Sequence, residues 1–126
     1  MHRIGKQFRF EAAHSLPDLP QGHKCARPHG HSYTVEVTLV ADGELTGPGF
    51  VVDFADLAPL GTHLNAELDH RDLNTVLPVA PTSENVAAHL YRWCTANLAL
   101  PVGVRLEKVR VSETASTFAE YAPMLP

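Results

Sequence analysis

Long apolar runs, basic clusters and cysteines are all scarce in this sequence of 126 residues. No stretch reaches the roughly 18 apolar residues that a membrane-spanning helix needs, and no apolar segment of a secretory signal follows the charged N-terminus. Ten basic residues against fourteen acidic ones give a net charge of −4; without a basic run, this balance argues against a nucleic-acid partner or a membrane partner. Two cysteines are too few for a disulfide framework. We therefore expect a cytoplasmic protein with reduced thiols.

Length and composition indicate one folded domain over residues 1–126. Hydrophobic residues make up 44% of the chain and charged residues 19%, which is typical of globular rather than disordered proteins. A domain of this size buries only about two-thirds of the surface that its unfolded chain exposes. Association with further copies would be a natural supplement to its stability.

Four segments alternate between apolar and polar residues, as half-buried strands do. The first two strands are expected over residues 4–14 and 29–41, with a loop rich in proline and glycine between them. Two more strands are expected over residues 104–113 and 117–121. A turn over residues 42–49 should follow the second strand.

Two helices are predicted between the strand pairs. The first begins near Asp53, a good N-cap residue, and carries four leucines at helical spacing between residues 57 and 68. The second follows a cap at Thr82 or Ser83 and ends near Ala99. The order β-β-α-α-β-β predicts an α+β fold, with an antiparallel sheet and two helices packed on one face. The open edges of such a sheet invite pairing with other copies.

Histidine is unusually frequent, with eight in the chain. His29 and His31 are two positions apart on one predicted strand, so they point to the same face. His14 is on the apolar face of the first strand and approaches that pair if the two strands are neighbours. Three imidazoles that converge on a sheet are the ligand set of a catalytic zinc site with an open fourth position. A closed structural site with Cys25 as fourth ligand, and a histidine pair without a metal, are alternatives that the spacing leaves open.

Asp69, His70 and Glu113 suggest chemistry less strongly. Asp69 and His70 can form an oriented acid/base pair, although a histidine at a helix C-terminus is the more common interpretation. Glu113 shares the apolar face of the third strand, where a carboxylate either pairs with a ligand or lies beyond the buried part. Cys94 is expected to fill the core.

The other four histidines carry weaker signals. His23 is expected either in a pocket or on a loop surface, and His89 on the solvent side of the second helix. His2 and His63 show no pattern that indicates a role.

Seven short motifs between residues 8 and 114 occur in the order of one known family. Together they resemble the 6-pyruvoyltetrahydropterin synthase/6-carboxytetrahydropterin synthase family. Three residues separate Cys25 from His29, a spacing that resembles the 6-carboxytetrahydropterin synthase branch on the route to preQ₀ and queuosine. The motifs are FEAAH at 10–14, GHKC at 22–25, CARPHGHSY at 25–33, VDF at 52–54, LDH at 68–70, PTSEN at 81–85 and VSET at 111–114.

The resemblance implies the T-fold, with the order ββααββ, and a homo-hexamer of two trimers with active sites between subunits. It also implies a zinc-dependent lyase that converts 7,8-dihydroneopterin triphosphate to 6-carboxy-5,6,7,8-tetrahydropterin, acetaldehyde and triphosphate. Residue roles carried over are zinc binding by His14, His29 and His31, proton abstraction by Cys25, a relay by Asp69 and His70, and pterin anchoring by Glu113.

Two alternatives belong beside this expectation. One is the sister activity, formation of 6-pyruvoyltetrahydropterin, and the other is a zinc-binding oligomer without catalysis. Lys24, Arg27 and Arg71 are candidates to meet the triphosphate of the substrate, and the sequence does not rank them.

Overall fold

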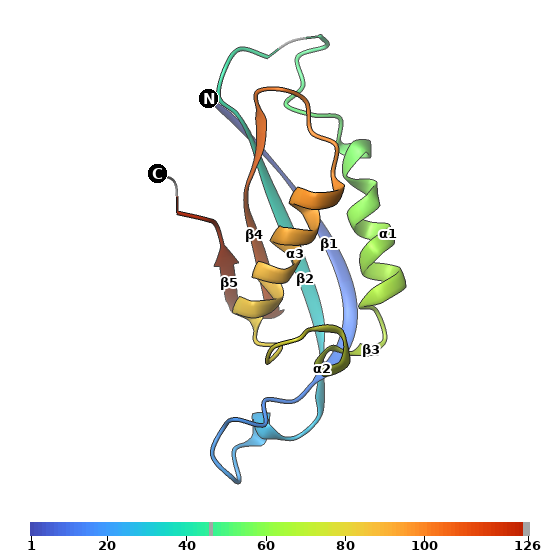
Figure 1. Ribbon diagram of the computed structural model, residues 1–126, viewed down its shortest axis with the longest axis vertical. Coiled ribbons are helices and arrows are strands. Elements are labelled where there is room, and N and C mark those ends of the chain that lie inside the picture. The colour runs from blue at the N-terminus through green and yellow to red at the C-terminus, as the bar shows by residue number, and fades with distance from the viewer. Residues whose placement is uncertain (46, 125–126) are drawn as a thin grey trace.

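The computed structural model describes residues 1–45 and 47–124 as one mixed sheet with helices on one face (Figure 1). The strand order in this sheet is β3-β1-β2-β4-β5. The strands are β1 (His2–His14), β2 (His29–Ala41), β3 (Arg71–Asp72), β4 (Val104–Thr114) and β5 (Thr117–Tyr121). The helices are α1 (Ala58–Glu67), α2 (Leu73–Val76) and α3 (Ser83–Asn97), with 3₁₀ turns η1 (Lys24–Ala26) and η2 (Phe54–Leu57).

The long central strands confirm the predicted alternation. β1 pairs antiparallel with β2 over its whole length, from His2 opposite Ala41 to His14 opposite His29. β2 in turn pairs antiparallel with β4, with one irregularity after Thr38. This arrangement places the even positions of β1 and the odd positions of β2 on the face that the helices cover.

The sheet is mixed rather than purely antiparallel, which corrects the prediction. The two-residue strand β3 runs parallel to β1, with Ala12 opposite Arg71. After α1 the chain meets the edge of β1, where the Asp69 carboxylate accepts a hydrogen bond from the backbone N–H of Glu11 at 2.7 Å. The backbone N–H of His70 also donates to the Glu11 carbonyl at this edge. A strand of two residues is too short to show an alternating pattern in the sequence.

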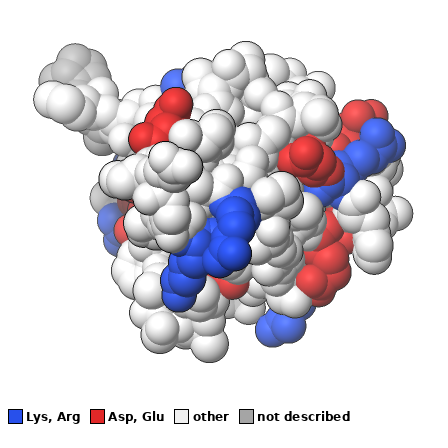
Figure 2. Space-filling view, turned by 90° about the horizontal axis from the view of Figure 1, so that it is seen from below, with Lys and Arg blue, Asp and Glu red and all other residues white. Residues whose placement is uncertain are grey.

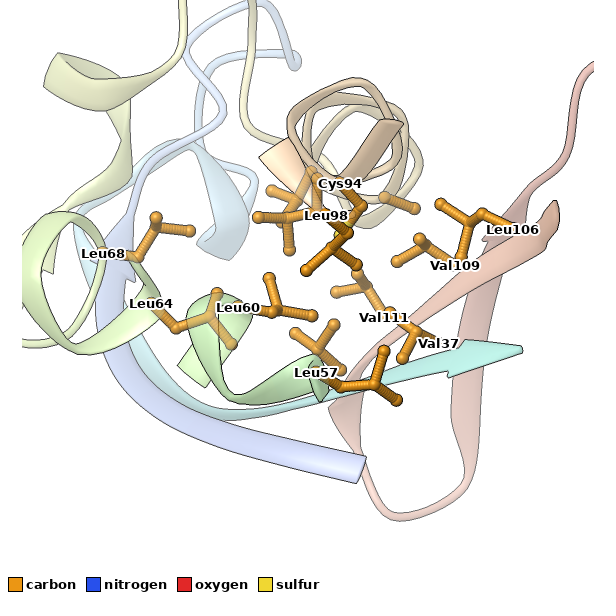
Figure 3. Close-up of a cluster of buried hydrophobic side chains, with 14 of the residues drawn as sticks. Val37, Leu57, Leu60, Leu64, Leu68, Cys94, Leu98, Leu106, Val109 and Val111 are labelled. Atoms are coloured by element: carbon orange, nitrogen blue, oxygen red, sulfur yellow. The ribbon is translucent and has the colours of Figure 1, made fainter. Parts of the chain in front are cut away.

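The core lies between the sheet and helices α1 and α3. The leucines at positions 57, 60, 64 and 68 are at most 1% exposed and point toward the strands, as do Cys94 and Leu98 of the α3 segment (Figure 3). They meet the valines of the inner sheet face, which are also buried. Apolar burial of this kind supplies most of the favourable free energy of folding.

The helix boundaries follow the predicted caps with small shifts. Asp53 caps the 3₁₀ turn η2, since its side chain accepts from the N–H of Ala55 at 2.9 Å, and α1 continues from there. Thr82 caps α3 by accepting from the N–H of Asn85 at 3.1 Å, and the helix ends at Asn97, before the expected Ala99.

Gly61 of α1 marks a close approach between helix and sheet. A Cβ atom at this position would lie 3.2 Å from Cε1 of Phe8. The absence of a Cβ atom at Gly61 therefore allows α1 to pack closely on β1, although glycine has a low helix propensity.

Two further expectations concern the rest of the chain. Within the turn expected over residues 42–49, Thr46 lies outside the described residues, and Gly47 and Gly49 have the positive φ angles, 60° and 88°, that glycine tolerates. Within the two described ranges, no helix combines the length and the apolar character needed to cross a bilayer.

Candidate functional site

Strand pairing brings three histidines together at one end of the sheet. His14 lies directly opposite His29, and His31 lies opposite Ala12 of the same strand. One ring nitrogen from each of His14, His29 and His31 lies within 4.8 Å of the others. His14 is 1% exposed, and the other two are half-buried. The predicted cluster is confirmed as a group that could hold a metal ion.

Backbone carbonyls select the tautomer of two of these rings. Nδ1 of His14 lies 2.8 Å from the carbonyl oxygen of Pro81, and Nδ1 of His29 lies 2.7 Å from that of Arg27. Because a carbonyl oxygen can only accept, both Nδ1 atoms carry the proton, and Nε2 of each neutral ring has a free lone pair. This outer hydrogen bond is the usual way in which a protein orients a metal-binding imidazole.

The inner nitrogens fit a bound cation. Nε2 of His14 lies 3.0 Å from Nε2 of His29, a separation at which two lone pairs repel unless a proton or a cation lies between them. Nε2 of His31 is buried and has no hydrogen-bond partner. Burial lowers the pKa of His31, with smaller opposing and assisting effects from Glu113 and the other two rings, so this ring is neutral near pH 7. A set of three imidazole ligands suits zinc first among the common metals.

Cys25 is not part of this three-histidine group. Its backbone is held in η1, where Nδ1 of His23 accepts from the N–H of Cys25 at 3.1 Å and the Cys25 carbonyl accepts from the N–H of Leu16 at 2.9 Å. The half-buried thiol lines a hollow of about 510 Å³ together with His29 and His31. Cys25 therefore lies beside the three-histidine group rather than within it.

Glu113 reaches the histidines from β4. Its carboxylate oxygens lie 3.6 Å from Nε2 of His31 and 3.9 Å from Nε2 of His14, and its side chain is 22% exposed. These distances are too long for hydrogen bonds, so both oxygens can still accept from a ligand. The structure thus places Glu113 at the site, one of the two interpretations that the sequence left open.

Asp69 and His70 form an oriented pair. The Asp69 carboxylate lies 2.8 Å from Nδ1 of His70, and its other oxygen accepts from the N–H of Glu11. These two hydrogen bonds lower the pKa of Asp69, with the backbone bond from Glu11 the larger cause. His70 has a φ of 58°, rare for a residue other than glycine, and its ring is 78% exposed. The pair therefore presents the outer nitrogen of the imidazole to solvent.

One chain does not bring all predicted site residues into one hollow. His70 lines a hollow with Glu11, Gly30 and Ser32, whereas Cys25 lines the hollow beside Lys24 and His29. His31 borders both. Glu113 and Cys25 each lie beside the three-histidine group, whereas His70 lines the other hollow.

Tyr33 is a site residue that the sequence reasoning missed. Its ring stacks on Phe10 at 4.8 Å and meets the rings of His14 and His31 edge-on. The hydroxyl is buried without a hydrogen-bond partner, and burial, then the charge of Glu113, raises its pKa. The sequence did contain a signal for Tyr33, because a residue two positions after His31 lies on the same face of the strand.

Cys94, His63 and His89 lie outside the three-histidine group and pack against other side chains or in the core. Cys94 is buried, and burial raises its pKa to about 12, which confirms the core assignment. His63 stacks on Trp93 at 4.1 Å. His89 is half-buried rather than solvent-facing, and burial lowers its pKa.

Known proteins show the same fold and sequence pattern. The family model described as 6-pyruvoyl tetrahydropterin synthase matches residues 3–124. The 6-carboxy-5,6,7,8-tetrahydropterin synthase of Synechocystis is 41% identical over 123 residues, which cover 94% of this chain and 91% of that protein. The dihydroneopterin monophosphate aldolase of Pyrococcus furiosus is 33% identical over 111 residues, with 88% and 89% covered. The structure of 6-pyruvoyl tetrahydropterin synthase from Caenorhabditis elegans superposes with a TM-score of 0.82 at 28% identity, covering 98% and 96%.

Proposed function

Because this chain belongs to the 6-pyruvoyl tetrahydropterin synthase family, we propose that it is a zinc-dependent 6-carboxy-5,6,7,8-tetrahydropterin synthase. The reaction would convert 7,8-dihydroneopterin triphosphate and one water to 6-carboxy-5,6,7,8-tetrahydropterin, acetaldehyde and triphosphate. The observation that carries this proposal is a group of three imidazoles with free inner nitrogens, beside which lie one carboxylate and one thiol. The similarity to the Synechocystis synthase supports the choice of product.

The metal would be held by His14, His29 and His31. When bound, zinc supplies a Lewis acid that polarises an oxygen of the substrate side chain. The outer hydrogen bonds to the carbonyls of Pro81 and Arg27 keep the rings in the ligating tautomer before the ion arrives.

Glu113 would fix the orientation of the substrate. A pterin carries two N–H donors on its 2-amino and ring-nitrogen edge, and the two free carboxylate oxygens of Glu113 can accept from both. Such a pairing holds the side chain of the substrate toward the histidines, where the bonds must break.

Cys25 and the Asp69–His70 pair would move protons. The sulfur of Cys25, which lines the hollow with His29 and His31, would take a proton from the carbon side chain of the substrate. Nε2 of His70, oriented through Nδ1 by Asp69, would give or accept a proton at a side-chain oxygen.

We further propose that copies of this chain share active sites in a homo-hexamer built as a dimer of trimers. The support is the separation of Cys25 from His70 in one chain, since a neighbouring copy can supply the missing half. The sheet also ends in strands β3 and β5, whose outer edges can pair with another copy. A cytoplasmic location, a single domain over residues 1–126 and a place in queuosine synthesis remain part of the proposal.

Product analysis with 7,8-dihydroneopterin triphosphate tests the proposed reaction. Acetaldehyde and a carboxypterin in equal amounts are the expected result. A pyruvoylpterin would reassign the protein to the sister activity. If dihydroneopterin monophosphate is supplied in a second assay and only this compound is cleaved, the activity would match the aldolase name of the Pyrococcus relative. Absence of any turnover in the zinc-loaded protein would leave a metal-binding oligomer without catalysis.

A further inference from the structure

Three of the ten basic side chains of this protein have no partner among the described residues. Four pair with carboxylates, two lie over aromatic rings, and Arg71 donates to the carbonyl of Ala66 at 3.0 Å. Arg9, Lys24 and Arg27 form no ion pair, side-chain hydrogen bond or ring contact within residues 1–45 and 47–124. A cation without a partner needs little rearrangement to bind an anion.

Lys24 and Arg27 lie on the same hollow as the candidate thiol. Both line it with Cys25, His29 and His31. Their backbone is anchored, because the N–H of Arg27 donates to the Lys24 carbonyl at 3.3 Å and the Arg27 carbonyl binds the His29 ring. Viewed from the end of the molecule that carries this loop, adjoining basic side chains form a patch (Figure 2).

We propose that Lys24 and Arg27 form the subsite for the phosphate chain of the substrate. This inference rests on the proposed function, in which the substrate is a pterin triphosphate. The planar guanidinium of Arg27 suits two phosphate oxygens at once, and the ammonium of Lys24 adds a point charge next to it. Arg71, the third candidate, is already bound to Ala66 and lines the hollow of His70.

The charges of the site set the direction in which the substrate lies. Glu113 is a carboxylate beside His31 and would repel a phosphate, whereas it can accept N–H groups of the ring. The ring therefore lies toward β4 and the phosphates toward η1, and the carbon side chain crosses between them, past the histidines. In this direction Cys25, which stands between Lys24 and Arg27 in the sequence, faces the side chain.

Binding of inorganic tripolyphosphate, measured by calorimetry on the zinc-loaded protein, tests this subsite. Lys24→Gln/Arg27→Gln should weaken binding by about tenfold or more, and added salt should weaken binding to the unsubstituted protein because the contacts are charged. Arg9→Gln is the matched control: this equally unpartnered cation lies on the opposite face of β1, so binding should be unchanged.

The outcomes separate this subsite from the proposed reaction. Equal affinity of the double variant and the unsubstituted protein would overturn the subsite, even if the pterin is turned over. Tripolyphosphate binding that depends on Lys24 and Arg27 would support it, even if no carboxypterin is formed. Should the double variant lose zinc or fold poorly, Lys24→Gln and Arg27→Gln are measured singly, and unchanged affinity in both would overturn the proposal.

Discussion

Under the proposed function, single residues of the site would either hold the metal or act beside it. His29 is a member of the three-histidine group, whereas Cys25 is outside it and lines the same hollow. His29→Ala should therefore lose most bound zinc and all turnover. Cys25→Ala should keep one zinc per chain and lose turnover by about 10²-fold or more, because only the proton transfer is removed. Metal analysis of dialysed protein, with a rate assay, measures both. Loss of zinc in Cys25→Ala would instead indicate a closed site with a cysteine ligand.

The hydroxyl of Tyr33 is predicted to destabilise the fold. It is buried without a partner, and a buried unsatisfied hydroxyl costs about 1–3 kcal/mol. Tyr33→Phe keeps the stack on Phe10 and should raise the free energy of unfolding by about 1 kcal/mol. Denaturant titration of the metal-free protein measures the change.

Tyr91→Phe serves as the control, because it should change the free energy of unfolding in the opposite direction. The Tyr91 hydroxyl donates to the carbonyl of Leu106 at 3.2 Å, so its removal should lower stability by about 1 kcal/mol. If Tyr33→Phe is the more destabilising of the two, the Tyr33 hydroxyl has a partner in solution.

At the scale of elements, the packing of α1 on β1 depends on a glycine. A Cβ at Gly61 would meet Cδ1 and Cε1 of Phe8 at 3.3 and 3.2 Å, and a branched side chain adds atoms against the same ring. Gly61→Val should therefore destabilise the protein by about 1–3 kcal/mol through overpacking. Thermal unfolding measures this, with the exposed Asn65→Val of the same helix as the control for β-branching alone. Equal effects of the two substitutions would show that Phe8 moves freely.

The β4–β5 hairpin is held by a carboxylate between two cations. Glu120 lies 3.0 Å from Nζ of Lys108 and 2.9 Å from Nη2 of Arg110. The hydrogen bond from Lys108, followed by that from Arg110, lowers the pKa of Glu120. Because the pKa of Glu120 is lower in the folded than in the unfolded protein, its ion pairs stabilise the fold at pH values above the unfolded-state pKa. This stabilisation is lost as the pH falls through the folded-state pKa.

Glu120→Gln should accordingly show a pH-dependent loss of stability. We expect a loss of a few tenths of a kcal/mol at pH 7, since the ion pair is largely exposed, and a difference from the unsubstituted protein that shrinks from about pH 5 downward. Denaturant titrations at several pH values measure this. Glu44→Gln, at a site without an ion pair among the described residues, should show no such trend, and a pH-independent loss in Glu120→Gln would contradict the pairing.

At the scale of the whole molecule, the separated halves of the site predict complementation. Cys25 and His70 line different hollows of one chain, so a shared site would take them from different copies. Mixed oligomers of Cys25→Ala and His70→Ala chains should regain about a quarter of full activity, the fraction of sites that draw an intact residue from each copy.

Co-refolding of the two inactive variants measures complementation. Each variant refolded alone is the control and should stay inactive. A mixture that forms oligomers and yet stays inactive would show that each chain builds its own site. Activity of His70→Ala refolded alone would instead show that His70 has no part in the reaction.

Much of the fold was predictable because its signals are local. Alternation placed His14, His29 and His31 on inward strand faces, and the leucines between residues 57 and 68 predicted a helix with one buried side. The parallel strand β3 was not predictable, because two residues carry no period and the contacts that place them at the edge of β1 come from a distant part of the chain. The partial burial of His89 was missed for a related reason, since helical periodicity does not show how far the packing extends around a helix.

The sequence by itself determined which side chains could act: three histidines on two strand faces, a cysteine in a loop, an Asp-His pair and a carboxylate on a third strand. Residue type and strand period are properties of short segments, so no tertiary contact is needed to identify them. Only the tertiary structure decided that His14 lies opposite His29, that Glu113 reaches them, and that Lys24 and Arg27 rather than Arg71 are free beside Cys25. Those facts depend on the register between distant strands and on which partners each side chain finds, and both are settled only when the chain packs.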